Sequence, residues 1–201
     1  DGAERLAIAE VVRSALDDLD PAPPWVSASS AGHIEHNPAL APHLQDAVYR
    51  LTRHAGTLTE DWYLNMRDKT AITHQQWIEV IDIVISVASV LRFAQLAGID
   101  RPEFPTALDG EPSRQEQPSK PASHHWVPVV HLEDMTPELE PFYQGLPVIA
   151  PVIRALSSVP AAMDTLSVLS NAQYIPNREM IDLNWSRGTL SRRQMEFVAG
   201  Q

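Results

Sequence analysis

The fold is decided by one stretch, Thr73-His-Gln-Gln-Trp-Ile-Glu-Val-Ile-Asp-Ile-Val-Ile-Ser-Val-Ala-Ser-Val-Leu-Arg-Phe-Ala-Gln-Leu-Ala-Gly98. Thr73 and Gln76 have the spacing of a capping box, in which two side chains satisfy free backbone groups at the start of a helix. Gly98 is a typical residue for the end of a helix, because it adopts a left-handed conformation at little cost. We therefore expect a helix from Gln75 to Ala97.

The middle of this stretch also has features of a β-strand. Residues 80–90 are rich in valine and isoleucine, which favour strands by propensity. The uninterrupted length argues against a strand, because strands of more than about ten residues are unusual. The segment is apolar on nearly all sides, so we expect a central helix that neighbouring elements bury on most faces.

Helices are also predicted on both sides of this element. Apolar residues at helical spacing, with proline and glycine between them, predict helices over 3–19, 40–54, 137–145, 148–157, 160–174, 176–187 and 191–201. The capping-box spacing of Thr57 and Glu60 predicts a further short helix that ends near Asp68. Five prolines between residues 101 and 125 indicate a linker. The sequence predicts an all-α fold with two helical units, 1–100 and 126–201, joined by the Pro-rich linker 101–125.

Composition excludes several classes of function. The 201 residues carry a net charge of −11 and are 44% apolar, enough for a core, and the basic residues are scattered, so we expect no nucleic-acid partner. No membrane span and no signal peptide are predicted, and we expect a cytoplasmic protein. The chain has no cysteine and no initiator methionine, which predicts a fragment or a processed piece.

Two groups of segments resemble the alkylhydroperoxidase-like, or carboxymuconolactone decarboxylase, family. Those that resemble the later half of its domain are Asp46–His54, Gly56–Tyr63, Gln76–Ile81, Leu91–Ala94 and Leu96–Gly98. Those that resemble its early half are Pro147–Pro160 and Leu190–Glu196. The order, late half before early half, is expected from a cut through a tandem duplication or from a rearranged member that pairs with another copy. The resemblance implies a helical bundle of that family's type.

The resemblance singles out Glu196. In the family, a glutamate shortly before a Cys-x-x-Cys pair relays a proton between the cysteine thiol and a histidine, and Ser191-Arg-Arg-Gln-Met-Glu196 matches that position. Glu196 is therefore the predicted catalytic residue. The alternative is an ordinary solvated or helix-capping carboxylate. The chain itself contains neither cysteine of the pair.

Other polar residues are weaker candidates. Glu79 and Asp82 lie within the apolar stretch and are either buried acid–base groups or carboxylates on an exposed helix edge; we favour the exposed edge. His33 and His36 have no third partner at a spacing typical of metal sites, so surface histidines are the better interpretation. No motif predicts a metal or another cofactor.

Three functions remain open at this point. The first is reduction of an organic peroxide, a small-molecule substrate, by a cysteine pair that lies outside this chain. In that chemistry a thiolate becomes a sulfenic acid, which the second cysteine resolves to a disulfide. The second is a non-catalytic helical scaffold or oligomerisation module, and the third is a thiol-independent decarboxylase-like enzyme. In each case we expect the chain to form a homo-oligomer.

Overall fold

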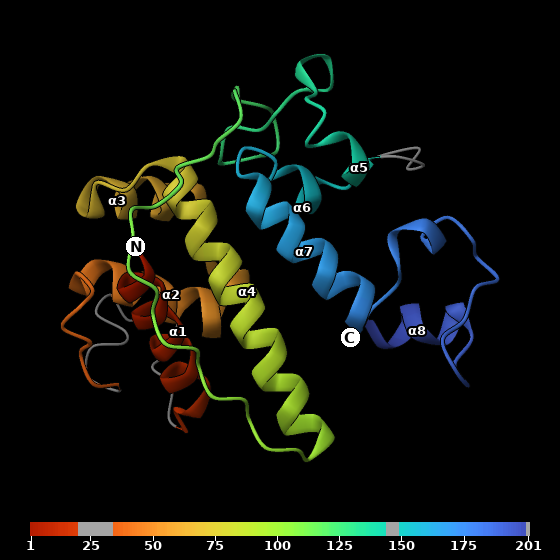
Figure 1. Ribbon diagram of the computed structural model, residues 1–201, viewed down its shortest axis with the longest axis horizontal. Helices are drawn as coiled ribbons and strands as arrows, with labels where there is room; N and C mark the ends of the chain where they lie inside the picture. The colour runs from red at the N-terminus through yellow and green to blue at the C-terminus, as the bar shows by residue number, and fades with distance from the viewer. Residues whose placement is uncertain (20–33, 144–148, 200–201) are drawn as a thin grey trace.

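The chain has an all-α fold, as the sequence predicts (Figure 1). A computed structural model describes residues 1–19, 34–143 and 149–199. Within these ranges there are eight α-helices and no β-strands, and the only β-type contacts are two isolated bridges, Lys120–Val129 and Arg187–Leu190. The arrangement is helix on helix, which requires each helix to bury an apolar stripe against its neighbours.

The decisive stretch forms the long helix α4 (His74–Ala97). Its start has the predicted capping box: the Thr73 hydroxyl accepts from the backbone N–H of Gln76, and the Gln76 side chain accepts from the backbone N–H of Thr73. Gly98 ends the helix in a left-handed conformation, with φ of 66°. Both predicted ends are therefore confirmed.

Two helices pack against α4 and against each other, α1 (Gly2–Asp17) and α2 (Pro42–His54) (Figure 1). The inward stripe of α1 follows the predicted helical spacing, with Ile8, Val12 and Leu16 buried. Leu19, the last residue of the predicted helix 3–19, is 98% exposed. The reason is that α1 ends at Asp17, so Leu19 lies beyond the last turn.

Helix α3 (Glu60–Thr70) is joined to the start of α4 through His74. Arg67 Nη1 lies 3.0 Å from His74 Nε2, and the Tyr63 hydroxyl lies 2.6 Å from His74 Nδ1. Because a guanidinium group only donates, Nε2 accepts and Nδ1 carries the hydrogen of a neutral ring. Burial and then the Arg67 charge lower the pKa of His74, which favours this neutral form.

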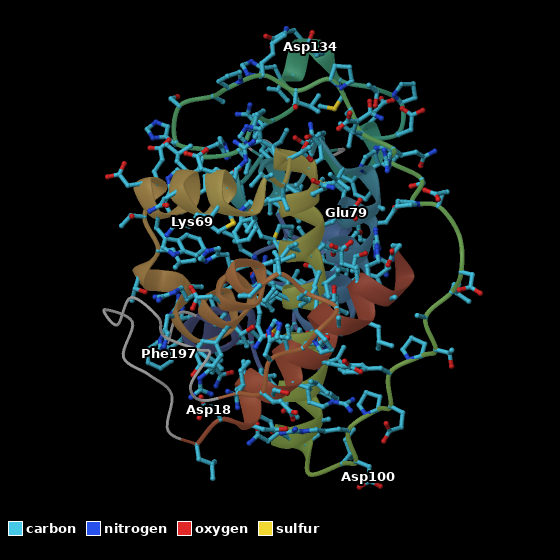
Figure 2. The ribbon with its side chains drawn as sticks, turned by 90° about the vertical axis from the view of Figure 1, so that its left-hand side faces the viewer. Asp18, Lys69, Glu79, Asp100, Asp134 and Phe197 are labelled. Atoms are coloured by element: carbon cyan, nitrogen blue, oxygen red, sulfur yellow. The ribbon has the colours of Figure 1, made fainter. Side chains whose placement is uncertain are left out.

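The predicted linker begins with an extended stretch, here called the return segment (residues 99–112), which runs back along α1 (Figure 1). Arg101 Nη1 donates to Asp17 at 2.6 Å, and Arg13 donates to the Pro102 carbonyl at 2.9 Å. The Arg13 guanidinium also lies 3.8 Å from the centre of the Phe104 ring. Figure 2 labels Asp18 and Asp100, which lie near the end of α1 and at the start of the return segment.

The remaining helices are α5 (Glu140–Tyr143), α6 (Pro151–Arg154), α7 (Pro160–Gln173) and α8 (Arg192–Ala199), with 3₁₀ turns at Leu132–Asp134 and Asn177–Glu179. Helix α7 packs against α4 (Figure 1). Buried residues before and after the linker belong to one apolar cluster. The division into two units remains a prediction.

One predicted helix is wrong, and two others are shorter than predicted. Within the described residues, 137–145 and 148–157 contain only α5 and α6, and residues 144–148 lie outside the described residues. Residues 176–187 form only the 3₁₀ turn Asn177–Glu179, followed by turns and a bridge between Arg187 and Leu190. The backbone carbonyls of Glu179, Met180 and Asp182 accept from the Arg192 side chain. A tertiary partner therefore satisfies groups that a helix would have satisfied locally.

The expected burial of α4 on most faces is also wrong toward its C-terminal end. Trp77, Ile78 and Val84 are buried, but Phe93 is 56% exposed and Leu96 is 88% exposed. By length and hydropathy α4 would be able to cross a membrane, and 22% of its most apolar window is buried; one such helix is weak evidence. Helices α1, α2 and α7 pack against α4, and the structure does not show a membrane protein. The cytoplasmic location remains a prediction.

The capping box of α4 predicts a measurable loss of stability. Thr73→Ala removes the hydroxyl that accepts from the Gln76 N–H, and we expect the free energy of unfolding to fall by about 1 kcal/mol. Thr189→Ala, at an exposed turn, is the matched control and should leave stability unchanged. Urea denaturation followed by circular dichroism measures both. Equal midpoints for the two variants would show that the cap does not stabilise α4.

Candidate functional site

Glu196 lies on α8 and is held by two side chains. Arg192, one turn earlier on α8, donates from Nε to Glu196 Oε1 at 2.6 Å. The Tyr174 hydroxyl, just after α7, donates to Glu196 Oε2. The carboxylate therefore connects α8 to the end of α7.

These hydrogen bonds also set the charge of Glu196. The bonds from Tyr174 and Arg192 lower the pKa of Glu196, so its carboxylate is ionised at neutral pH. Burial and the neighbouring carboxylate in turn raise the pKa of Tyr174, which keeps the phenol protonated and able to donate. The lowered pKa keeps Glu196 ionised and therefore free of a bound proton, although it also makes the carboxylate a weaker base.

Arg192 was not predicted to have a role. Arg193 is exposed, but Arg192 is only 8% exposed and donates to three backbone carbonyls as well as to Glu196. The i, i+4 spacing of Arg192 and Glu196 was the available signal, because such pairs meet on one helix face.

A second site lies between α1, α4 and the return segment. It is an open cavity of about 570 Å³, within the usual size range of small-molecule pockets. Its wall on α4 includes Asp82 and Ser86, and its wall on α1 includes Arg5 and Leu6. Phe104 and the residues after it form the third side. Sequence reasoning did not find this cavity, because it is built from three separate segments.

The two carboxylates of α4 have different surroundings. Glu79 lies beside α1, and its Oε2 accepts from Arg5 Nη2 at 2.8 Å (Figure 2). Glu79 and Arg5 form a partly exposed ion pair at the edge of α4, close to the predicted position of Glu79 on an exposed helix edge. Asp82 is more buried, and burial raises its pKa to about 6, although the Arg5 charge and hydrogen bonds from Thr165 and Ser86 act in the opposite direction. Asp82 can therefore exchange a proton near neutral pH.

The histidine candidates do not form a metal site in the described residues. His33 lies outside them. The His36 ring contacts the side chain of Gln45, with Nδ1 3.1 Å from Oε1. Among the residues that the structure describes, no group of three or more His, Asp or Glu side chains is arranged to hold a metal ion.

Comparison with known proteins gives no family for this chain. No family model matches it, and no curated protein and no solved structure is significantly similar to it. The resemblance based on Glu196 and the helical segments therefore stays a prediction.

The surroundings of Asp82 predict a pH-dependent contribution to stability. Between the ordinary pKa of 3.8 and the folded value of about 6, the folded chain binds a proton that the unfolded chain has released. Stability from this group therefore falls as pH rises through that window. We expect Asp82→Asn to gain about 1 kcal/mol relative to the unchanged protein across the window, after allowance for solvent screening.

Urea titrations below, within and above the window measure this difference. Asp100→Asn, at an exposed position after α4, is the control and should follow the unchanged protein at each pH. A constant offset between Asp82→Asn and the unchanged protein at all pH values would contradict the raised pKa.

Proposed function

We propose that this chain belongs to the alkylhydroperoxidase-like family and takes part in the reduction of organic peroxides by cysteine thiols located outside these 201 residues. Its own contribution is the helical scaffold and the proton-accepting carboxylate of Glu196. The observation that carries the proposal is the setting of Glu196, an ionised carboxylate held from two sides by Arg192 and Tyr174.

The order of helices supports this assignment. The resemblance implies an amphipathic helix, then a capped short helix, then a long buried helix. Helix α4 has the length of the third element, but its C-terminal part is exposed. Helices α2, α3 and α4 follow one another in this order, and Thr59 caps α3 by accepting from the backbone N–H of Trp62. The order alone is common among helical proteins, so the assignment also needs the glutamate.

The proposed reaction balances with two thiols and one peroxide. Glu196 accepts the proton of the first thiol, directly or through a neighbouring group, and the thiolate attacks the outer peroxide oxygen. The O–O bond breaks, a sulfenic acid forms, and the alcohol leaves with a proton. The second thiol then attacks the sulfenic sulfur, so that water leaves and a disulfide forms. Arg192 and Tyr174 fix the position of the carboxylate.

The test uses the complete natural reading frame that encodes this chain. Removing the base should slow peroxide reduction at neutral pH by about 10²- to 10⁴-fold in Glu196→Gln. The loss should shrink as pH approaches about 8.5, where an ordinary thiol ionises without a base. Glu116→Gln, at an exposed position in the linker, is the matched control and should retain full activity.

Three outcomes would reject this proposal. The first is a Glu196→Gln profile that matches the Glu116→Gln profile at every pH. The second is a reading frame without any cysteine. The third is peroxide consumption by the isolated 201-residue chain, since that chain has no thiol.

A second candidate, a non-catalytic module that assembles with its own copy, is favoured by the C-terminal part of α4. Val90, Phe93 and Leu96 follow one another at helical spacing and are 37%, 56% and 88% exposed. An apolar stripe on the longest helix is what a helix–helix contact between two copies requires. The thiol-independent alternative depends instead on Asp82 and its cavity.

This second candidate predicts a dimer that is disrupted by positive charges introduced on the C-terminal part of α4. We expect sedimentation velocity to show a dimer of the unchanged chain and a monomer after Phe93→Lys with Leu96→Lys. Leu183→Lys, at a 76% exposed position outside the stripe, is the control and should leave the dimer intact. A monomeric unchanged chain would exclude self-assembly through α4.

A further inference from the structure

The cavity between α1, α4 and the return segment has a wall fixed by a close backbone contact. A Cβ atom at Gly2 would lie 2.3 Å from the Leu108 carbonyl oxygen, so only glycine allows the return segment to pass this close to α1. Contacts of Arg101 with Asp17 and of Arg13 with Pro102 hold the same segment farther along α1. The third wall of the cavity is therefore held in place at both ends.

The interior of the cavity is largely apolar. The side chains that form its apolar surface are Leu6, Ala9, Ile83, Val87, Phe104 and Leu108. Such a surface favours the hydrocarbon part of a ligand, because burial of apolar area stabilises a complex.

The charges around the cavity are mainly negative. Asp82 lines it from α4, and Asp109 and Glu111 line it from the return segment. Arg5 lines it from α1; its Nη2 donates to Glu79 at 2.8 Å, and its charge also acts on Asp82. At the chain start, the Asp1 carboxylate caps α1 by accepting from the Glu4 N–H, and the Asp1 ammonium pairs with Glu4 at 3.4 Å.

We propose that this cavity binds a small organic cation, with an ammonium group at the Asp82 carboxylate and an alkyl or aryl body against the apolar wall. The proposal does not depend on peroxide chemistry or on Glu196. The partly buried Asp82 carboxylate would pair with the ammonium, although Arg5, Thr165 and Ser86 also interact with it. The exposed carboxylates of Asp109 and Glu111 add a weaker attraction that solvent screens, and all three groups repel an anion of the same size. A neutral ligand gains the apolar contacts alone.

Three six-carbon probes separate these contributions: hexylammonium, hexanol and hexanoate have the same chain and carry positive, zero and negative charge. Titrations at neutral pH and low salt, followed by the backbone NMR shifts of Ile83 and Val87, measure binding. We expect hexylammonium to bind with Kd of about 1 mM or weaker, as its size implies. Hexanol should bind about tenfold more weakly, and hexanoate should not bind detectably.

Substitutions test whether Asp82 binds the ammonium and whether the probes occupy this cavity. Asp82→Asn should reduce hexylammonium affinity to that of hexanol and leave hexanol unchanged, whereas Asp100→Asn should change neither. Val87→Phe, which fills the cavity, should abolish both interactions. Val168→Phe, on the exposed face of α7, is its control and should abolish neither.

The proposal is overturned if the three probes bind equally, if hexanoate binds best, or if no probe shifts Ile83 and Val87. It is also overturned if Asp82→Asn retains the preference for the ammonium. The ranking of the probes on the unchanged protein is decisive by itself if a variant does not fold. Loss of this preference would leave the peroxidase proposal untouched, since that proposal is tested at Glu196.

Discussion

Burial of one side of α4 against α1 and α2 is the constraint on which the other elements depend. Trp77, Ile78 and Val84 are buried on α4, and the Trp77 ring also contacts Trp62 of α3. A closely packed interior of this kind restricts how far the neighbouring helices can shift. The capping interactions at Thr73 and Gly98 set where α4 begins and ends. The return segment then follows α1 because it leaves α4 at this fixed point.

The same constraint explains the cavity. Helix α4 is covered by α1 and α2 on one side and by α7 on another, and the return segment crosses the remaining gap beside α1 without a helical surface to fill it. Asp82 lies at this gap, where packing is incomplete and solvent is reduced. A partly desolvated carboxyl group is the expected result, and its raised pKa follows from position rather than from any sequence motif.

Sequence signals between neighbouring residues predicted the features of the fold that local interactions determine. The capping box at Thr73, the glycine end at Gly98 and the buried stripe of α1 follow from spacing along the chain, and each is confirmed. Residues 176–187 were predicted wrongly because their carbonyls bind Arg192, a contact that spacing within the segment does not reveal. The partner of Glu196 on α8 had a signal in the i, i+4 spacing, whereas Tyr174 is brought to it by tertiary structure.

The two acidic side chains show how environment separates groups of similar chemistry. Glu196 accepts hydrogen bonds from a phenol and a guanidinium, and these stabilise its charge. Burial destabilises the charge of Asp82, and this effect outweighs the opposite effects of Arg5, Thr165 and Ser86. Glu196 is thus suited to remain an anion that positions a neighbour or accepts a proton briefly. Asp82 is suited to gain or lose a proton near neutral pH. A bound cation would favour the ionised form of Asp82, whereas a proton accepted from a thiol would neutralise Glu196. The two groups lie at separate sites, so the two proposed roles are chemically independent.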